Sequence, residues 1–457
     1  MSKPEEGARC SDCGLTTVRA DLFRREPRSF RKDFRYYCPT CWATRHRQNQ
    51  RNRWWWMAGM AAMGALSVRI SPHDSFGWLL LNLVWLDICF IIAVTVHEFS
   101  HAFAGRLVGF RIFRVIVGSG RTWWRGALLG FDVEAKAFPF SGLTFGAPRQ
   151  LERTPWKHLF FIAAAPLANV ALVGLAALFI KDPISAPYTS DAFNGWFVLG
   201  LANFITVFLS LWPRTYQKEI GTKRSDGLFL LQLLSSKKRS EILEETHVGW
   251  FCMEAGACIE QGRFAEGRGW LDRGLAEFPK NIRLRESYVA TLIAIGEYQA
   301  ARSTAVELLA EIPPQHVRRL MVLNNIAYLD ALLEDPALFD EADRYSTEAL
   351  AAIPWHPALK NTRGVVLLAL NRLDEALPLL RASANAPNQP PGSRAECLCT
   401  LAMAEARQDE LAAAERYFTT ARQINPQCPL LPRTETVLAD MKSRKREARG
   451  AAEVSPG

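Results

Sequence analysis

The amino-acid sequence predicts a mainly α-helical protein: a polytopic bundle of about four membrane-spanning helices with a small β-hairpin insert, between two water-soluble parts. Three observations support this fold class. Apolar runs crowd the stretch from Trp54 to Leu234, two cysteine pairs precede it, and an array of helix pairs follows it. The chain of 457 residues is therefore better divided into membrane and soluble parts than into domains of average length. The predicted divisions are residues 1–48, 54–240, 245–430 and 442–457.

The first division contains two Cys-x2-Cys pairs, Cys10/Cys13 and Cys38/Cys41. Four thiolates can close a tetrahedral zinc site with no open position, so the pairs predict a structural zinc in a zinc-ribbon-like domain. A redox dithiol is the alternative, but it would need only one pair. The other cysteines lack a framework spacing, which argues against a secreted disulfide scaffold and for a reducing compartment. The charged N-terminus predicts no cleavable signal peptide.

Four apolar runs follow the cysteine pairs. The first is only about 17 residues long, against the roughly 20 that a straight span needs. Lys and Arg crowd the flanks on one face of this arrangement, and the connectors on the other face are nearly free of them. We therefore expect an integral protein of a bacterial inner membrane with both termini cytoplasmic. The runs are Trp54–Ile70, Trp78–Phe103, Leu159–Ile180 and Phe193–Trp212.

The formal charge of +9 comes mainly from these flanking segments. Basic residues at the ends of apolar helices record membrane orientation, and no basic stripe lies on a soluble part. Nucleic acid is therefore not the expected partner. Between the second and third runs, residues 131–146 (FDVEAKAFPFSGLTFG) alternate apolar and polar side chains between glycines, which predicts a strand or hairpin.

From about Gly249 the sequence predicts helix pairs with a period of about 34 residues. A small or turn residue ends each first helix, an aromatic residue or Leu opens the second, and Pro ends the unit. This pattern resembles tetratricopeptide repeats, about five of them, although the early Trp of that family is missing and another stacked-helix array is the alternative. The second helices are predicted to open at Phe264, Tyr298, Phe339, Leu373 and Leu411. The charged tail after Lys442 is predicted to be disordered.

The second apolar run contains the string His97-Glu98-Phe99-Ser100-His101. Residues four apart lie one turn apart on one helix face, so both imidazoles can reach a single ion. Zinc makes a bound water more acidic, and the adjacent Glu98 carboxylate can accept its proton as the water attacks a carbonyl. The motif predicts a catalytic metal site with Glu98 as the general base.

The position of this motif within an apolar helix strengthens the prediction. Ionisable residues in a membrane cost a few kcal/mol unless they are paired or ligated, and they are usually functional. The alternative is a hydrogen-bonded polar patch between helices. Asp87 also lies in this run, and the sequence names no partner for it.

The motifs together resemble the site-2 protease family of intramembrane zinc metalloproteases. That family carries HExxH on one helix, a GPxxN-like motif on the next, and an N…P…LDG segment on a later helix. This chain has Ala165-Pro166-x2-Asn169, then Asn203, Pro213 and Ser225-Asp226-Gly227.

The resemblance implies that His97, His101 and Asp226 bind the catalytic zinc, and that Asn169 and Asn203 lie near the site. Ala165 and Ser225 stand where the family has Gly and Leu, and a basic insert lengthens the gap from Asn203 to Asp226. On chemistry alone, the rival third ligands are Asp132, Glu134 and His158. The resemblance also implies that residues 131–146 present the substrate as an extended strand.

Two functions follow as hypotheses. The first is an intramembrane zinc endopeptidase that cleaves membrane-anchored proteins, with one catalytic and one structural zinc. The second is a catalytically silent membrane scaffold whose zinc ribbon and helical repeats bind partner proteins. A base beside two ligands favours the enzyme, because a scaffold has no need of Glu98. A transporter is disfavoured, since four spans without an inverted repeat do not match that class.

Overall fold

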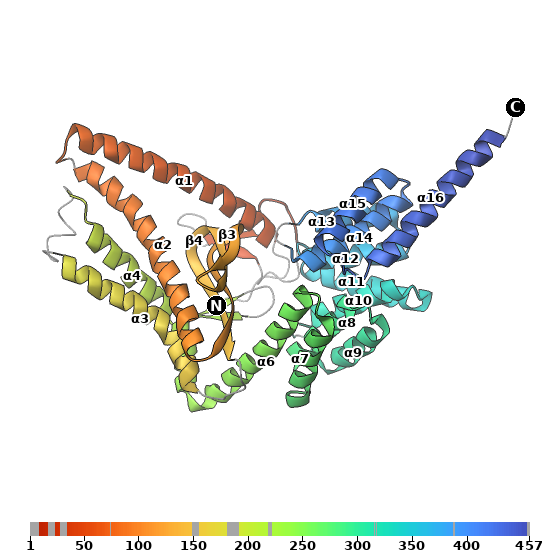
Figure 1. Cartoon of the computed structure of the whole chain (residues 1–457). Helices are drawn as coiled ribbons and strands as arrows, with labels where there is room; N and C mark the ends of the chain where they lie inside the picture. The colour runs from red at the N-terminus through yellow and green to blue at the C-terminus, as the bar shows by residue number, and fades with distance from the viewer. Residues whose placement is uncertain are drawn as a thin grey trace. The chain divides into compact units, whose positions relative to one another are not determined.

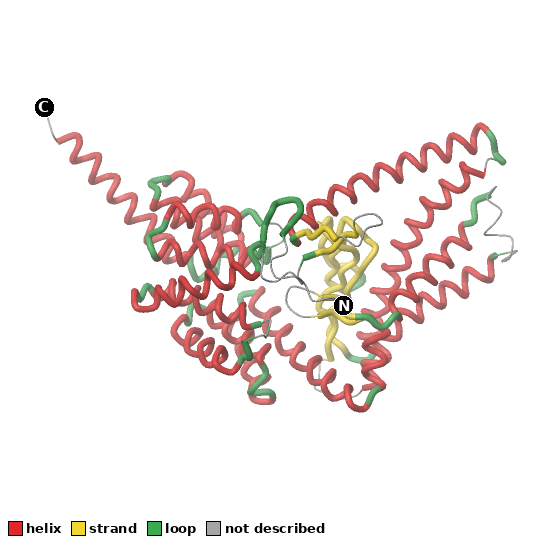
Figure 2. The backbone as a smooth tube through the Cα atoms, turned by 180° about the vertical axis from the view of Figure 1, so that it is seen from behind, coloured by secondary structure: helices red, strands yellow, loops and turns green. Residues whose placement is uncertain are grey.

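The computed structural model describes residues 9–16, 23–27, 34–73, 75–148, 155–180, 192–217, 222–314, 316, 318–386 and 389–454. The chain divides into two compact units, one formed by Cys41–Trp250 and the other by Met1–Thr40 with Phe251–Gly457. Figures 1 and 2 show the helices and strands of both units.

The N-terminal part is a small β structure that leads into a long helix. An isolated bridge joins Arg9 to Thr16, and strands β1 (Arg24–Pro27) and β2 (Phe34–Tyr37) pair antiparallel. Helix α1 (Pro39–Ile70) follows β2 with only Cys38 between them, and Pro39 is its first residue. Proline is favoured there because its missing N–H would have no partner within the helix.

Four long helices form the apolar part of the chain: α1, α2 (Ser75–Leu107), α3 (Pro155–Phe179) and α4 (Gly195–Leu211). Among the described residues, α2 and α3 are long and apolar enough to cross a membrane, whereas α4 is apolar but has only 17 residues. The prediction of four spans is thus not confirmed. The first predicted span is the second half of α1, whose first half is rich in Arg and Gln.

The outer faces of these helices expose large apolar side chains. Trp55 and Trp56 of α1 are 74% and 72% exposed, and Leu178 of α3 is 81% exposed. Large exposed apolar side chains in such number are typical of helices that are covered by a partner or by lipid.

A long hairpin connects α2 to α3. Strands β3 (Phe110–Leu128) and β4 (Phe131–Pro148) pair antiparallel, with Phe110 opposite Pro148 and Leu128 opposite Phe131. Residues 115–117 of β3 pair both with residues 142–144 and with residues 133–135 of β4, so both halves of β4 flank the first half of β3. The register is interrupted around Pro139, which has no N–H to contribute to a ladder. The strand predicted for residues 131–146 is present, but its partner β3 was not predicted. Figure 1 shows the hairpin in the wedge between α1 and α2.

A second, small hairpin explains the long gap between Asn203 and Asp226. Strands β5 (Thr215–Gln217) and β6 (Thr222–Arg224) pair antiparallel and carry the basic insert. Helix α5 (Asp226–Leu234) begins two residues after β6. The basic insert is therefore carried by a hairpin whose second strand ends just before Asp226.

The C-terminal part is an array of helix pairs. Its second helices begin at the five predicted residues: Phe264, Tyr298, Phe339, Leu373 and Leu411. Small residues such as Ala376, Ala402 and Ala414 are fully buried where helices cross, which permits close packing. The helices are α6 (Ser236–Glu260), α7 (Phe264–Glu277), α8 (Ile282–Ala294), α9 (Tyr298–Glu311), α10 (Arg319–Leu333), α11 (Phe339–Ala352), α12 (Pro357–Ala369), α13 (Leu373–Ala384), α14 (Pro391–Arg407) and α15 (Leu411–Ile424), with the short 3-10 helix η2 (Pro336–Leu338) before α11.

The structure differs from the disorder predicted for residues 442–457. Helix α16 runs from Leu431 to Val454, so most of this segment continues a helix that starts in the repeat part. Its residues are mainly Ala, Arg, Lys and Glu, which have high helix propensity despite their charge.

Candidate metal centre

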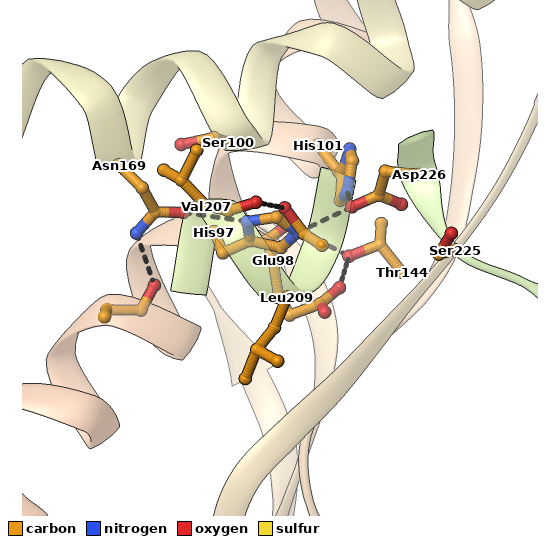
Figure 3. A network of polar contacts seen from close by, with 12 residues as sticks. His97, Glu98, Ser100, His101, Thr144, Asn169, Val207, Leu209, Ser225 and Asp226 are labelled. Atoms are coloured by element: carbon orange, nitrogen blue, oxygen red, sulfur yellow. Dashed lines mark hydrogen bonds and ion pairs between the residues drawn. The ribbon is translucent and has the colours of Figure 1, made fainter. Parts of the chain in front are cut away.

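Three predicted ligands meet in the structure. The Nε2 atom of His97 lies 2.9 Å from Oδ2 of Asp226, and Nε2 of His101 lies 3.7 Å from the same oxygen. The ligand atoms of the three residues all lie within 4.8 Å of one another. The two imidazole rings come from successive turns of α2, with centroids 5.0 Å apart and planes almost perpendicular. Figure 3 shows the rings and the carboxylate converging on one point. Two nitrogens and one carboxylate oxygen match the donor set of catalytic zinc.

Local structure at the start of α5 places Asp226. Ser225 is the N-cap of this helix: its Oγ accepts a hydrogen bond from the Leu228 N–H at 3.3 Å and donates one to the Trp212 carbonyl at 2.8 Å. Gly227 packs on the end of α4, where an added Cβ would lie 1.8 Å from the Leu211 carbonyl oxygen. The Asp-Gly pair thus has two features: Asp226 brings a carboxylate to the two imidazoles, and Gly227 permits the close approach to α4.

Hydrogen bonds orient both imidazoles. The Nδ1 atom of His97 lies 2.8 Å from Oδ1 of Asn169, and Nδ1 of His101 lies 2.8 Å from the Phe161 carbonyl oxygen. A carbonyl oxygen accepts, so each Nδ1 carries the proton and each Nε2 is free to bind a metal. The Asn169 amide in turn donates to the Ala93 carbonyl at 3.0 Å and to Oδ1 of Asn203 at 2.8 Å. The two asparagines implied by the resemblance are thus both fully buried beside the site.

Glu98 lies next to the three ligands and is only 6% exposed. The hydroxyl of Thr144 in β4 lies 2.7 Å from Glu98 Oε2 and 2.9 Å from the Glu98 carbonyl oxygen. Gly142 of the same strand also packs against Glu98. A Cβ added at this glycine would lie 2.3 Å from Cγ of Glu98, so no larger residue fits there without a shift. The proposed base is therefore in direct contact with the hairpin (Figure 3).

The rival ligands have other partners. Two arginines bind Asp132, Arg114 at 3.0 Å and Arg125 at 3.2 Å. Burial raises the pKa of Asp132, but its hydrogen bonds with these two arginines outweigh that effect and hold the pKa below its usual value. His158 packs with its ring centroid 5.0 Å from that of Phe110. None of the rivals belongs to the metal-binding group found among the described residues.

Glu134, another rival ligand, also has other bonding partners. It accepts a hydrogen bond from Thr122 and lies 3.4 Å from the Lys136 ammonium. Asp87, for which the sequence named no partner, forms an ion pair with Arg53 of α1.

The four N-terminal cysteines form a second group whose ligand atoms lie within 4.8 Å of one another. The Sγ atoms of Cys13 and Cys38 are 3.8 Å apart, and the Cys38 N–H donates to Sγ of Cys10 at 3.3 Å. Burial raises the pKa of Cys10, but hydrogen bonds from the backbone of Cys13, Cys38 and Asp12 outweigh it and lower the pKa to about 7. A thiol that ionises near neutral pH is suited to binding a metal.

Sequence reasoning missed three residues: Gly142 and Thr144, which contact Glu98, and Arg53, which pairs with Asp87. Gly142 and Thr144 lie in the predicted strand, but nothing in the sequence shows which strand position faces Glu98. Arg53 lies at the end of a basic segment next to the first apolar run. That position could have suggested a role, but the segment was interpreted only as a signal of membrane orientation.

The comparisons with known proteins agree with this geometry. Residues 85–357 match the model of peptidase family M50. A protein of Pasteurella multocida named "Putative zinc metalloprotease PM1991" is 25% identical over 212 residues, which cover 42% of this chain and 45% of that protein. A "Putative zinc metalloprotease" of Xylella fastidiosa strain Temecula1 is 28% identical over 110 residues, 21% of this chain and 25% of that protein. The chain thus spans less than half the length of these curated relatives.

Among solved structures, a thermophilic TPR protein of Thermus thermophilus covers 43% of this chain and 99% of its own, at 18% identity and a TM-score of 0.34. The family match covers more than half of the chain and includes His97, Glu98, His101 and Asp226. The chain belongs to peptidase family M50, the site-2 protease family of zinc metalloproteases.

Proposed function

We propose that this protein is an intramembrane zinc endopeptidase that hydrolyses peptide bonds of membrane-anchored substrates. The observation that carries the proposal is the convergence of His97, His101 and Asp226 beside Glu98. The donor set fits zinc, because two neutral imidazoles and one carboxylate leave room for a further ligand in a tetrahedral site.

The chain's own residues supply the proton transfer and the orientation. A zinc ion bound by the three ligands would polarise both a water molecule and the substrate carbonyl. Glu98 is adjacent to His97 in α2 and is nearly excluded from solvent, so its carboxylate can accept the proton of the attacking water and pass it to the leaving amine. Asn169 and the Phe161 carbonyl hold the two imidazoles in the tautomer that binds a metal through Nε2.

The membrane setting is part of the proposal. The span-length helices α2 and α3, together with exposed apolar side chains on α1 to α4, support an integral membrane protein. We assign four spans with both termini cytoplasmic on the distribution of Lys and Arg at the flanks, and a bacterial inner membrane because the similar zinc metalloproteases come from bacteria. Water and substrate would then enter the site from the cytoplasmic side.

The hairpin and the soluble parts would bind proteins. An extended substrate segment can add to a strand edge, and pairing of this kind keeps a peptide bond unwound for cleavage. The repeat array has the architecture of modules that bind extended peptides or partner proteins, so it would recruit a substrate or regulator. The four cysteines would bind one structural zinc, which a domain this small needs in order to fold.

The decisive experiment compares the purified wild type with Glu98→Gln on a membrane-anchored reporter. We expect turnover to fall by roughly 100-fold or more, as for the loss of a general base, while zinc content stays unchanged. His73→Ala, at an exposed loop position, is the matched control and should behave as wild type. Cleavage at the parental rate by Glu98→Gln would overturn the proposal. Zinc binding without any cleavage by the wild type would favour the scaffold hypothesis.

A further inference from the structure

An ion pair joins α1 to α2 beside the hairpin. The guanidinium of Arg53 contacts the carboxylate of Asp87, whose side chain is only 14% exposed. Neither residue is a metal ligand, and Asp87 lies ten positions before His97 within an apolar helix. Charged residues in such a helix are retained where they pair and act, because an unpaired charge there is costly.

The same guanidinium holds an aromatic residue of the hairpin. The Cζ atom of Arg53 lies 4.1 Å from the ring centroid of Phe140 and 5.5 Å from that of Phe138. Both distances are within the range of a cation–π interaction. The Phe140 ring also packs edge-on against Phe90 of α2, with centroids 6.1 Å apart. Arg53 and Phe90 thus clamp Phe140 between α1 and α2.

From this clamp, β4 runs along α2 to the proposed base. Phe140 and Thr144 are four residues apart, about 13 Å in an extended strand. Phe90 and Glu98 are eight residues apart, about 12 Å along a helix. The two lengths match, so the strand is fixed at both ends: Phe140 lies against Phe90, and Thr144 donates to Glu98.

Between these ends the strand covers Glu98. The absent side chain of Gly142 is what permits the contact, since a Cβ there would lie within 2.3 to 2.5 Å of Cγ, Oε1 and Cδ of Glu98. A substrate peptide cannot occupy the space that Gly142 fills, so β4 blocks this side of Glu98 while it stays in place.

We propose that Arg53 and Asp87 form a latch that holds residues 138–144 over Glu98 and keeps the site closed until that strand moves away. This inference rests on the proposed function for its effect on cleavage, but the position of the strand can be tested without any activity. Arg53 and Asp87 are positioning residues, because they act on the site only through Phe140.

The test is a cross-link between α2 and β4. A Glu98→Cys/Gly142→Cys variant places two thiols on facing positions of α2 and β4, and it removes the Glu98 carboxylate that an added side chain at position 142 would otherwise meet. Mild oxidation should link them, and mass spectrometry identifies the joined peptides despite the native cysteines. Adding Arg53→Gln or Asp87→Asn should lower the yield at least threefold. Exchanging the two charges, with Arg53→Asp and Asp87→Arg together, should not restore it, because a carboxylate at position 53 makes no cation–π contact with Phe140.

The matched control is Arg125→Gln, which removes an ion pair with Asp132 from the same hairpin, away from Glu98. It should leave the cross-link unchanged. In the otherwise native chain, Asp87→Asn should raise reporter turnover about threefold at constant zinc content. A cross-link that is insensitive to Arg53→Gln and Asp87→Asn would overturn the latch. If Asp87→Asn weakens the cross-link but lowers reporter turnover, the strand does not act as a cover over Glu98. If even the wild type cleaves nothing, the proposed function fails while the cross-link still decides the latch.

Discussion

The Nε2 atom of His97 lies 2.9 Å from Oδ2 of Asp226, although 129 residues separate the two along the chain. The intervening segment contains a long hairpin, two apolar helices and the basic insert. Asp226 reaches the imidazole because it is the first residue of α5, capped by Ser225 and pressed against α4 through Gly227. The carboxylate proposed as the third ligand is therefore positioned by the packing of the start of α5 on the end of α4.

Removing a ligand should remove one zinc and spare the other. We expect the purified wild type to hold two zinc ions per chain, and His97→Ala or Asp226→Ala to hold one. Cys38→Ser should lose the other zinc, because it opens the four-cysteine site. Elemental analysis of the purified variants measures this, and retention of both ions by Asp226→Ala would refute its assignment as a ligand.

Asn169→Ala should weaken zinc binding without removing a ligand. The Nδ1 proton of His97 would lose its acceptor, and the ring would be free to turn or to change tautomer. Loss of such an orienting partner typically lowers metal affinity by roughly 10- to 100-fold. Competition with a graded chelator measures this affinity. Asn82→Ala in the same bundle is a suitable control, since Asn82 bonds to the Ala192 carbonyl instead; equal affinities in both variants would contradict the orienting role.

Gly227→Ala should also disrupt the catalytic site, although glycine has no side chain to contribute. Its new Cβ would lie 1.8 Å from the Leu211 carbonyl oxygen, so α5 must move and withdraw Asp226 from the histidines. We expect zinc content to fall as in Asp226→Ala. Gly174→Ala in α3 is the control, because its Cβ would meet nothing within 4 Å. Full zinc occupancy in Gly227→Ala would show that the helix start can relax without cost.

The repeat array should lose stability as pH rises from about 4.5 to 7. Burial raises the pKa of Glu396 in α14 to about 7, so the folded chain keeps a proton that the unfolded chain releases near pH 4.5. Unfolding then releases a proton in this window, and stability falls until Glu396 is ionised in both states. Glu396→Gln should remove this loss, on the order of 3 kcal/mol above pH 7. Thermal unfolding at pH 5 and pH 8 measures it, and an equal shift in Glu405→Gln would contradict a specific role for Glu396.

Much of this fold was predictable because its signals are local. The five second helices of the repeats open at the predicted residues, since a turn residue followed by an aromatic residue or Leu marks a helix start in the sequence itself. The pairing of His97 with His101 follows from helix periodicity alone. Resemblance supplied Asp226, Asn169 and Asn203, which periodicity could not connect to α2.

The remainder depends on contacts between distant segments. Strand β3 was not predicted, because its sequence, FRIFRVIVGSGRTWWRGAL, carries arginines that membrane orientation already explained. The contacts of Thr144 and Gly142 with Glu98 require knowledge of which face of β4 meets α2. The partner of Asp87 lies 34 residues earlier, in a helix whose register against α2 is set only by packing. The tail was predicted to be disordered from its charge, whereas its helix propensity prevails in α16.

The hydrogen bonds that run from Asn203 through Asn169 to His97 cross from α4 to α3 to α2. Two apolar helices in lipid gain little free energy from one alignment along their axes over another, because lipid tails are as apolar as the helix side chains. A chain of buried amides singles out one alignment, as one polar residue fixes the stagger of a coiled coil. The hydrogen bonds that orient the His97 imidazole therefore also fix how the three helices align along their lengths. Correct packing of the bundle and the ability to bind metal then depend on the same bonds.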